Sequence, residues 1–323
     1  MTHPFAGIPA AGVAVAASLL IAGCMNGARA GAAAPVHPEK PDLTVAAVPS
    51  LDSAGLYIAE QRGLFAAEGL HVTIVSERSS STALTGQLAG KYDVTVGGYV
   101  SYILAEALHH ARLEILAAAS VLRPDSQEVV VPAGSPIHAT SQLEGKSIAV
   151  NVLNNIGMLL VSSALEDNGV QSSHVHYVAI PFPQMAAALQ AHKVDAAYMP
   201  EPFMTRAEMA IGAQPVMDTD QGATASFPIS GFVATQAWAH KYPKTAAAFR
   251  RAIVAAQAIA RTSLAAVQKA MRGFAGISTM AAALMTPPRY PLSADPVPIQ
   301  RVADLMLKFG LFQVAFDIRP MLR

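Results

Sequence analysis

Short apolar runs alternate with amphipathic runs from residue 43 to the end of the chain. Strands are predicted where a few apolar and β-branched residues follow one another, as in Leu43–Val48 and His71–Ser76. Helices are predicted where a serine opens a longer run and a glycine closes it, as in Ser53–Arg62 and Ser80–Leu88. Strands that alternate with helices predict parallel sheets with helices on both faces, an α/β fold class.

This alternation starts a second time after residue 146, so we expect two similar α/β lobes. Two similar tetrapeptides each follow an expected helix and open an expected strand: Lys91-Tyr92-Asp93-Val94 and Lys193-Val194-Asp195-Ala196. The further strands are expected at 94–96, 114–120, 147–151, 174–178 and 196–199, and the further helices at 101–109, 155–168, 183–192 and 202–211.

Two apolar segments are expected to cross between the lobes, at 128–131 and 231–235. They place the first lobe at 42–127 and 236–323 and the second lobe at 128–235. After the second crossing the chain predicts one long helix at 244–271 and another at 299–309.

The N-terminal segment has the pattern of a bacterial lipoprotein signal. An apolar run from Ala11 to Ala22, too short for a stable membrane span, leads to Ile21-Ala22-Gly23-Cys24. Small residues directly before a cysteine form a lipobox, so we expect a signal peptide at 1–23 and acylation of Cys24. Residues 24–41 are rich in Ala, Gly and Pro and predict a flexible tether. The protein is thus expected to be exported and anchored by lipid to the cell membrane, facing the periplasm or the exterior.

Composition excludes several classes of function. The 22 basic and 22 acidic side chains give a formal net charge of +0, which argues against nucleic acid as a partner. The single cysteine excludes an internal disulfide and a cysteine-rich metal centre. Hydrophobic residues make up 52% of the chain, enough for a large core.

No enzyme motif is visible along the chain. Gly145-Lys146-Ser147 resembles the end of a phosphate-binding loop, but Thr140 stands where that motif needs its first glycine. His174 and His176 share one strand face without a third ligand nearby in sequence. We therefore expect no catalytic residue, no metal and no cofactor.

Polar loops follow several of the expected strands, at the edge where open α/β sheets bind ligands. Four hydroxyls at one expected helix start exceed what capping needs and, with free backbone N–H groups, are suited to an anion. Glu201 lies between two prolines and is suited either to the helix dipole or to an amine of the ligand. The candidate ligand-binding residues are Asp52, Ser79, Ser80, Ser81, Thr82, Gly97, Gly98, Asn154, Asn155 and Glu201.

Several segments resemble one family of transport proteins. Gly55–Leu70 and Val194–Phe203 are the most specific, supported by Gly90–Val94, Gly134–Ile137 and Leu143–Lys146. On these segments the chain resembles the ABC-transporter substrate-binding proteins of the sulfonate, nitrate, taurine and thiamine-pyrimidine group. The resemblance implies a type II periplasmic-binding fold that traps its ligand between two lobes. It also implies a permease and an ATPase as partners, and the binding protein itself is expected to be a monomer.

The sequence leaves two ligand classes and one different class of function open. A small organic anion such as a sulfonate, nitrate or taurine is favoured by the serine cluster. An amino-pyrimidine precursor of thiamine is favoured by the acidic pair Asp52 and Glu201. A cytoplasmic enzyme similar to the thiamine-pyrimidine synthases would share the fold, but those enzymes carry a cysteine-rich motif and this chain has only Cys24.

Overall fold

The computed structural model of the chain describes residues 37–322, without the side chains of residues 274 and 275. The expected signal peptide, the expected lipidation site Cys24 and residues 24–36 of the expected tether lie outside the described residues. Residues 37–323 form one compact unit by their internal contacts. Within the described part, no helix is long and apolar enough to cross a bilayer.

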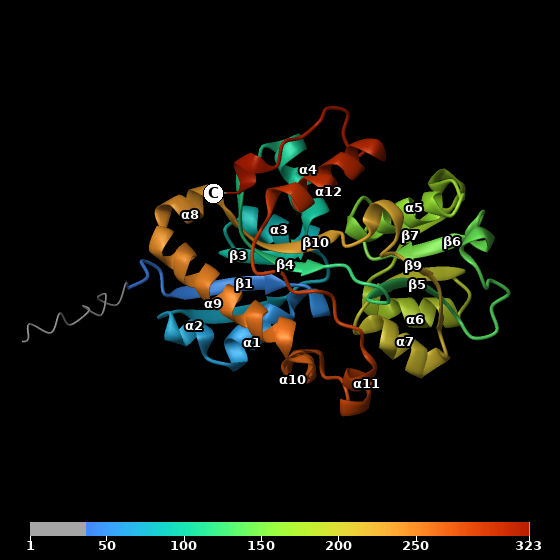
Figure 1. The fold of residues 1–323 in the computed structure, drawn as a ribbon, viewed down its shortest axis with the longest axis horizontal. Coiled ribbons are helices and arrows are strands. Elements are labelled where there is room, and N and C mark those ends of the chain that lie inside the picture. The colour runs from blue at the N-terminus through green and yellow to red at the C-terminus, as the bar shows by residue number, and fades with distance from the viewer. Residues whose placement is uncertain (1–36, 323) are drawn as a thin grey trace, which may run out of the picture. The chain divides into compact units, whose positions relative to one another are not determined.

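Two five-stranded sheets have the same arrangement of strands (Figure 1). In each sheet three strands run parallel, and a fourth lies antiparallel between them and the fifth. The first sheet has the order β2(His71–Ser76), β1(Asp42–Ala47), β3(Val94–Gly98), β10(Pro228–Thr235) and β4(Leu113–Val121). The second has the order β7(His176–Ala179), β6(Ser147–Val150), β8(Ala196–Pro200), β5(Gln127–Val131) and β9(Gln214–Asp218).

The chain crosses between the sheets twice, from β4 to β5 and from β9 back to β10. The first strand after each crossing is the antiparallel strand of the sheet that the chain enters. The prediction of parallel sheets holds for three neighbouring strands of each sheet but is wrong for β5 and β10, which arrive from the opposite sheet and run against their neighbours. The lobe limits at 42–127 with 236–323 and at 128–235 stay a proposal; in the structure Gln127, the first residue of β5, lies in the second sheet, and all of β10 lies in the first.

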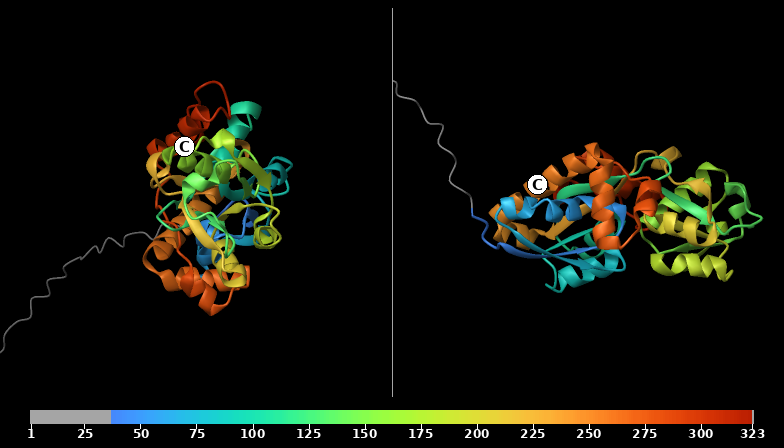
Figure 2. Two further views of the ribbon diagram at one scale, coloured as in Figure 1. Left: turned by 90° about the vertical axis from the view of Figure 1, so that its right-hand side faces the viewer. Right: turned by 90° about the horizontal axis from the view of Figure 1, so that it is seen from below.

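Helices cover both faces of the first sheet (Figures 1 and 2). One face carries α1(Ala54–Gln61), α2(Leu64–Ala67), α9(Pro243–Thr262) and α10(Leu264–Ala275); the other carries α3(Ser80–Leu88), α4(Tyr99–His109) and α12(Pro296–Lys308). The second sheet carries α5(Ile156–Asp167), α6(Phe182–Gln190) and α7(Phe203–Ile211). The short helices α8(Gln236–Lys241) and α11(Thr279–Leu284) complete the C-terminal part.

The long helix expected at 244–271 is in fact two helices, α9 and α10. Ser263 between them has extended backbone angles, φ −132° and ψ 92°. Its hydroxyl accepts a hydrogen bond from the N–H of Ala266 and so caps α10. The hydrophobic period continues through this break, which is why the pattern alone predicted one helix.

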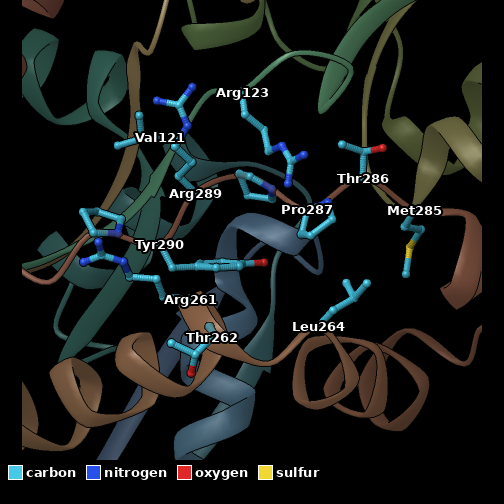
Figure 3. A pocket seen from close by; sticks show the side chains of 13 residues that line it. Val121, Arg123, Arg261, Thr262, Leu264, Met285, Thr286, Pro287, Arg289 and Tyr290 are labelled. Atoms are coloured by element: carbon cyan, nitrogen blue, oxygen red, sulfur yellow. The ribbon is translucent and has the colours of Figure 1, made fainter.

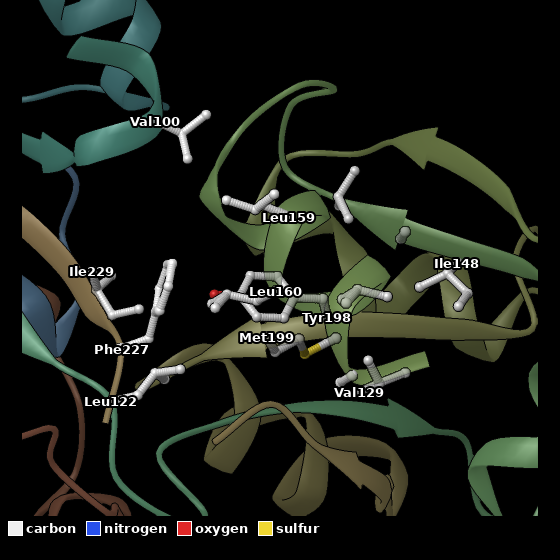
Figure 4. Packing of buried hydrophobic residues seen from close by; sticks show 14 of the residues in the cluster. Val100, Leu122, Val129, Ile148, Leu159, Leu160, Tyr198, Met199, Phe227 and Ile229 are labelled. Atoms are coloured by element: carbon white, nitrogen blue, oxygen red, sulfur yellow. The ribbon is translucent and has the colours of Figure 1, made fainter. Parts of the chain in front are cut away.

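Two large apolar clusters support the fold. One lies between the first sheet and its α1–α9–α10 layer, where the rings of Phe65 and Phe249 stack at 5.4 Å. The other joins the core of the second sheet to α4 and to the crossing segments (Figure 4). Leu122, Phe227 and Ile229, which lie in or next to the crossings, belong to this second cluster. The crossings are therefore packed into a core and hold the two sheets together.

The last residues of the expected tether are bound to the body. The Glu39 carboxylate accepts hydrogen bonds from the N–H groups of Lys244 and Thr245, at 3.1 and 2.9 Å. The Lys40 ammonium pairs with Asp93. Glu39 thus caps the first turn of α9, where a carboxylate is stabilised by the helix dipole. The tether expected at 24–41 therefore ends before Glu39.

Candidate functional site

The strands β1, β3, β6 and β8 direct their carboxyl ends toward a cavity between the two sheets. Its volume is about 50 Å³, room for a few water molecules or one small polar group. Side chains from both sheets line it, and none of them is Lys or Arg. The lining residues with polar groups are Ser50, Asp52, Ser53, Ser80, Gln127, Asn151, Asn155, Tyr198 and Ser230, together with the backbone of Gly97 and Gly98.

The serine cluster divides into a cap and one cavity-lining hydroxyl. Ser79 caps α3: its hydroxyl accepts from the N–H of Thr82 at 3.1 Å and contacts the hydroxyls of Ser81 and Thr82. Ser81 is exposed. Ser80 alone of the four lines the cavity, and its hydroxyl accepts a hydrogen bond from the N–H of Gly98 at 2.9 Å. Three of the four predicted hydroxyls, those of Ser79, Ser81 and Thr82, therefore bond to one another at the start of α3 and do not line the cavity.

Gly97 and Gly98 allow three segments to meet beside the cavity. A Cβ on Gly97 would lie 2.5 Å from the Ser80 hydroxyl oxygen and 3.2 Å from the Ser80 backbone. A Cβ on Gly98 would lie 2.8 Å from Ile156 at the start of α5. Larger residues at either position would force these segments apart, since real Cβ atoms do not approach so closely. The contact between Gly98 and Ile156 joins the two lobes.

Of the two predicted asparagines, Asn155 lines the cavity and Asn154 does not. Asn155 caps α5, because its side-chain oxygen accepts from the N–H of Met158 at 3.1 Å, and its amide group donates to Asn151. Both Asn151 and Asn155 line the cavity. Asn154 is exposed and lines a different cavity of about 450 Å³ instead.

Three helices begin at the cavity: α3 next to Ser80, α4 after Gly98 and α5 after Asn155. The first N–H groups of a helix have no partner inside it, and the helix dipole places partial positive charge there. The site can therefore stabilise a small anion with backbone and neutral side-chain donors.

Asp52 is the one acidic side chain that lines the cavity. Its carboxylate accepts hydrogen bonds from Ser120 at 2.6 Å, from Ser50 at 3.1 Å and from the amide of Gln127 at 3.1 Å. Gln127 belongs to the second sheet, so this interaction crosses between the lobes, and Tyr198 donates to the same amide group. Burial raises the pKa of Asp52, although the hydroxyls of Ser120 and Ser50 act in the opposite direction.

Glu201 does not line this cavity. Its carboxylate accepts from the N–H of Thr205 at 3.1 Å and from the Thr205 hydroxyl at 2.7 Å, which caps α7. Its backbone oxygen accepts from the N–H of Leu51 across the lobes, at 3.0 Å. Burial raises the pKa of Glu201. The placement fits the helix-dipole role and does not fit contact with an amine in the cavity.

Apart from Ser50 and Ser53, which flank the predicted Asp52, sequence reasoning missed five residues of the site. Polar side chains within otherwise apolar strands could have revealed two of them, since Ser120 is the last residue but one of β4 and Gln127 is the first residue of β5. The others became visible only when the two sheets were placed together. The missed residues are Ser120, Gln127, Asn151, Tyr198 and Ser230.

In the described part of the chain, no three His, Cys, Asp or Glu side chains gather in a way that could hold a metal ion.

Comparisons with known proteins agree with this architecture. The family model described as NMT1/THI5 like matches residues 50–263. No curated protein sequence matches the chain. The alkanesulfonate-binding protein SsuA from Xanthomonas axonopodis pv. citri, bound to MOPS, is 19% identical with a TM-score of 0.75, over 88% of this chain and 99% of that one.

Two further solved structures share the fold. The periplasmic nitrate-binding protein NrtA from Synechocystis PCC 6803 is 14% identical with a TM-score of 0.74, over 89% of this chain and 87% of that one. The desulfurization enzyme DszB is 19% identical with a TM-score of 0.67, over 88% of this chain and 96% of that one. The predicted type II periplasmic-binding fold is confirmed, and the fold occurs in both binding proteins and an enzyme.

Proposed function

Because the chain belongs to the NMT1/THI5-like family, we propose that it is the extracytoplasmic, lipid-anchored substrate-binding component of an ABC importer for a small organic anion. The observation that carries the proposal is the meeting of three helix N-termini at one cavity between the lobes. Sulfonates, nitrate and taurine are the candidate ligands; the first two are supported by the shared fold of SsuA, an alkanesulfonate-binding protein, and NrtA, a nitrate-binding protein. A permease and an ATPase are the proposed partners.

Ligand binding requires the lobes to move. The cavity of about 50 Å³ is far smaller than an organic ligand site, which usually reaches several hundred Å³. A ligand enters when the cross-lobe contacts separate, and its own contacts with both lobes then favour the closed form. The contacts that must open include those from Leu51 to Glu201, from Gln127 to Asp52 and from Ile156 to Gly98.

A second ligand class is favoured by Asp52. Its buried carboxylate lines the cavity, and only neutral groups bind to it. A ligand with a protonated amine or ring nitrogen, such as an amino-pyrimidine, would supply the missing positive charge. This candidate stays second because the acidic partner proposed for it, Glu201, lies outside the cavity.

We propose binding without turnover. The cavity is lined by hydroxyl, amide and carboxylate groups, but none of its residues is a cysteine, histidine or lysine able to act as an activated nucleophile or as its base. The enzyme hypothesis requires chemical change of a bound ligand. Recovery of the unaltered ligand after long incubation with the protein would support binding alone.

A thermal-shift screen tests the proposed function. Purified chain from Met25 to Arg323 is melted with methanesulfonate, taurine, nitrate and an amino-pyrimidine. A ligand at a hundred times its Kd stabilises the folded state by about 2.7 kcal/mol, which raises Tm by several degrees. We expect a rise with at least one anion and none with the amino-pyrimidine. A rise with the amino-pyrimidine alone would select the second candidate.

A further inference from the structure

Charge is distributed unevenly along this neutral chain. Residues 221–294 contain no Asp or Glu, although the whole chain has 22 of each charge sign. The same segment contains eight basic side chains: Lys241, Lys244, Arg250, Arg251, Arg261, Lys269, Arg272 and Arg289. It forms β10, α8, α9, α10 and α11, so the excess charge lies mainly on one helical layer of the first sheet (Figure 1).

Most of this charge is exposed and uncompensated. Arg250 is half-buried, and the other seven basic side chains are exposed. Arg250 pairs with Glu114 at 3.7 Å and Arg251 with Glu68 at 2.6 Å. Across residues 37–322, none of the remaining six forms an ion pair. We call the surface of α9, α10, α11 and residues 285–292 the cationic face.

A large cavity, which we call the arginine cavity, lies at the end of α9 (Figure 3). Its volume is about 680 Å³, and Arg261, Arg289 and Arg123 line it together with the hydroxyls of Thr262 and Thr286. Arg123 comes from the crossing between β4 and β5, so a third guanidinium joins the two from the cationic face. No carboxylate lines the cavity. Its dimensions and donors suit a phosphate headgroup rather than a bare inorganic ion.

Apolar side chains project from the same surface. Leu264 is 51% exposed, Met280 64%, Leu284 60% and Leu292 42%. Leu264 also lines the arginine cavity. Exposed leucine and methionine beside arginine and lysine form the combination that inserts into the interface of an anionic bilayer. A purely electrostatic partner such as an acidic protein would not need these apolar groups.

The attachment of the N-terminal segment points to the same surface. Glu39 binds the first turn of α9, while Arg261 lies in its last turn. The helix has 20 residues and is therefore about 30 Å long. The segment that leads to the expected lipid anchor thus joins the body at one end of the cationic face, and the arginine cavity lies at the other end.

We propose that the cationic face docks on the membrane surface and that the arginine cavity holds the phosphate headgroup of an anionic lipid. This inference goes beyond the proposed function, and its test needs no transport ligand. Docking would hold an anchored binding protein in one orientation at the bilayer instead of leaving it free on its tether. Each basic side chain near an anionic surface strengthens binding about fivefold.

Vesicle flotation tests the proposal with the chain from Met25 to Arg323, which lacks Cys24 but holds every contact described above. The vesicles contain phosphatidylcholine alone or with phosphatidylglycerol at roughly two to one. We expect flotation with the anionic vesicles only, and its loss at high salt. No flotation, or equal flotation with both vesicles, would overturn the proposal.

Charge variants locate the surface. Replacing Arg261, Lys269 and Arg289 with Gln should weaken vesicle binding roughly 100-fold. The matched control replaces Arg112, Lys146 and Lys193 with Gln, which removes the same charge from other parts of the body and should change binding less than threefold. Equal effects of the two triple variants would refute docking through this face.

Leu264→Ser with Leu284→Ser tests the apolar contribution. Both side chains are exposed, so the fold should tolerate the changes. We expect binding to fall at least tenfold while its salt dependence persists, because the basic side chains remain. Unchanged binding would show that no side chain inserts and would overturn docking on a bilayer. Thermal melting of every variant confirms that it is folded.

Discussion

Replacing Glu128 with Gln should stabilise the protein, and the gain should grow with pH. Glu128 lies in β5 opposite Asp218 of β9 and is only 7% exposed. Burial raises its pKa from 4.5 to about 7, and the carboxylates of Asp218, Asp125, Glu208 and Glu201 add to the effect. The folded protein therefore holds a proton at this position that the unfolded chain releases more readily.

The magnitude follows from proton linkage. Because the folded pKa is the higher one, the folded state is favoured below pH 4.5 and loses this advantage as pH rises to about 7. The full difference between the two pKa values corresponds to about 3 kcal/mol in the free energy of unfolding. Since the side chain keeps some contact with water, we expect about half of that, roughly 1–2 kcal/mol. Glutamine is neutral at every pH, so the variant does not lose this part of its free energy of unfolding as the pH rises.

Thermal melts of wild type and Glu128→Gln between about pH 4.5 and pH 8 measure the effect. The Tm values should agree at the acid end, and the variant should melt about 2–5 °C higher at the alkaline end. Glu60→Gln, an exposed position on α1, is the matched control and should follow wild type throughout. A constant offset between Glu128→Gln and wild type at every pH would refute the reasoning.

Three further changes test the anchor and the site. Cys24→Ser should leave a longer precursor without labelled palmitate, and equal labelling of wild type and variant would exclude the anchor. Asp52→Asn should leave the affinity for an anion unchanged or improve it, whereas an amine-bearing ligand should lose about tenfold or more in a calorimetric titration. Gly98→Ala places a Cβ 2.8 Å from Ile156 and should weaken ligand binding roughly tenfold by obstructing closure; full affinity in the same titration would show that this contact does not matter.

Local signals were sufficient for most elements of the fold. The predictions of β2 at His71–Ser76 and α3 at Ser80–Leu88 are confirmed, because β-branched residues mark the first and a capping serine opens the second. The break at Ser263 was missed because its cap interrupts the backbone without interrupting the hydrophobic period. The strand β9 was missed because Gln214–Asp218 is short and partly exposed at a sheet edge.

The site was only partly accessible from sequence. Asp52, Ser80 and Asn155 follow strands at the predicted edge, Gly97 and Gly98 end β3 at the same edge, and the structure brings all five to one cavity. The roles of Ser79 and Glu201 depend on which way each side chain turns, and both turn to cap a helix. Gln127 lies far from Asp52 in the chain, so its contact with that carboxylate depends on the packing of the two lobes.

The central claim is that a small anion binds between the lobes through donors from both. Calorimetric titration of the chain from Met25 to Arg323 with the best anion from the screen tests it most directly. Ser80→Ala in the first lobe and Asn155→Ser in the second, which keeps a capping oxygen, should each weaken binding roughly tenfold. The exposed Ser81→Ala should bind like wild type. An affinity that is unchanged in both cavity variants, or heat released by an amino-pyrimidine and by no anion, would contradict the account.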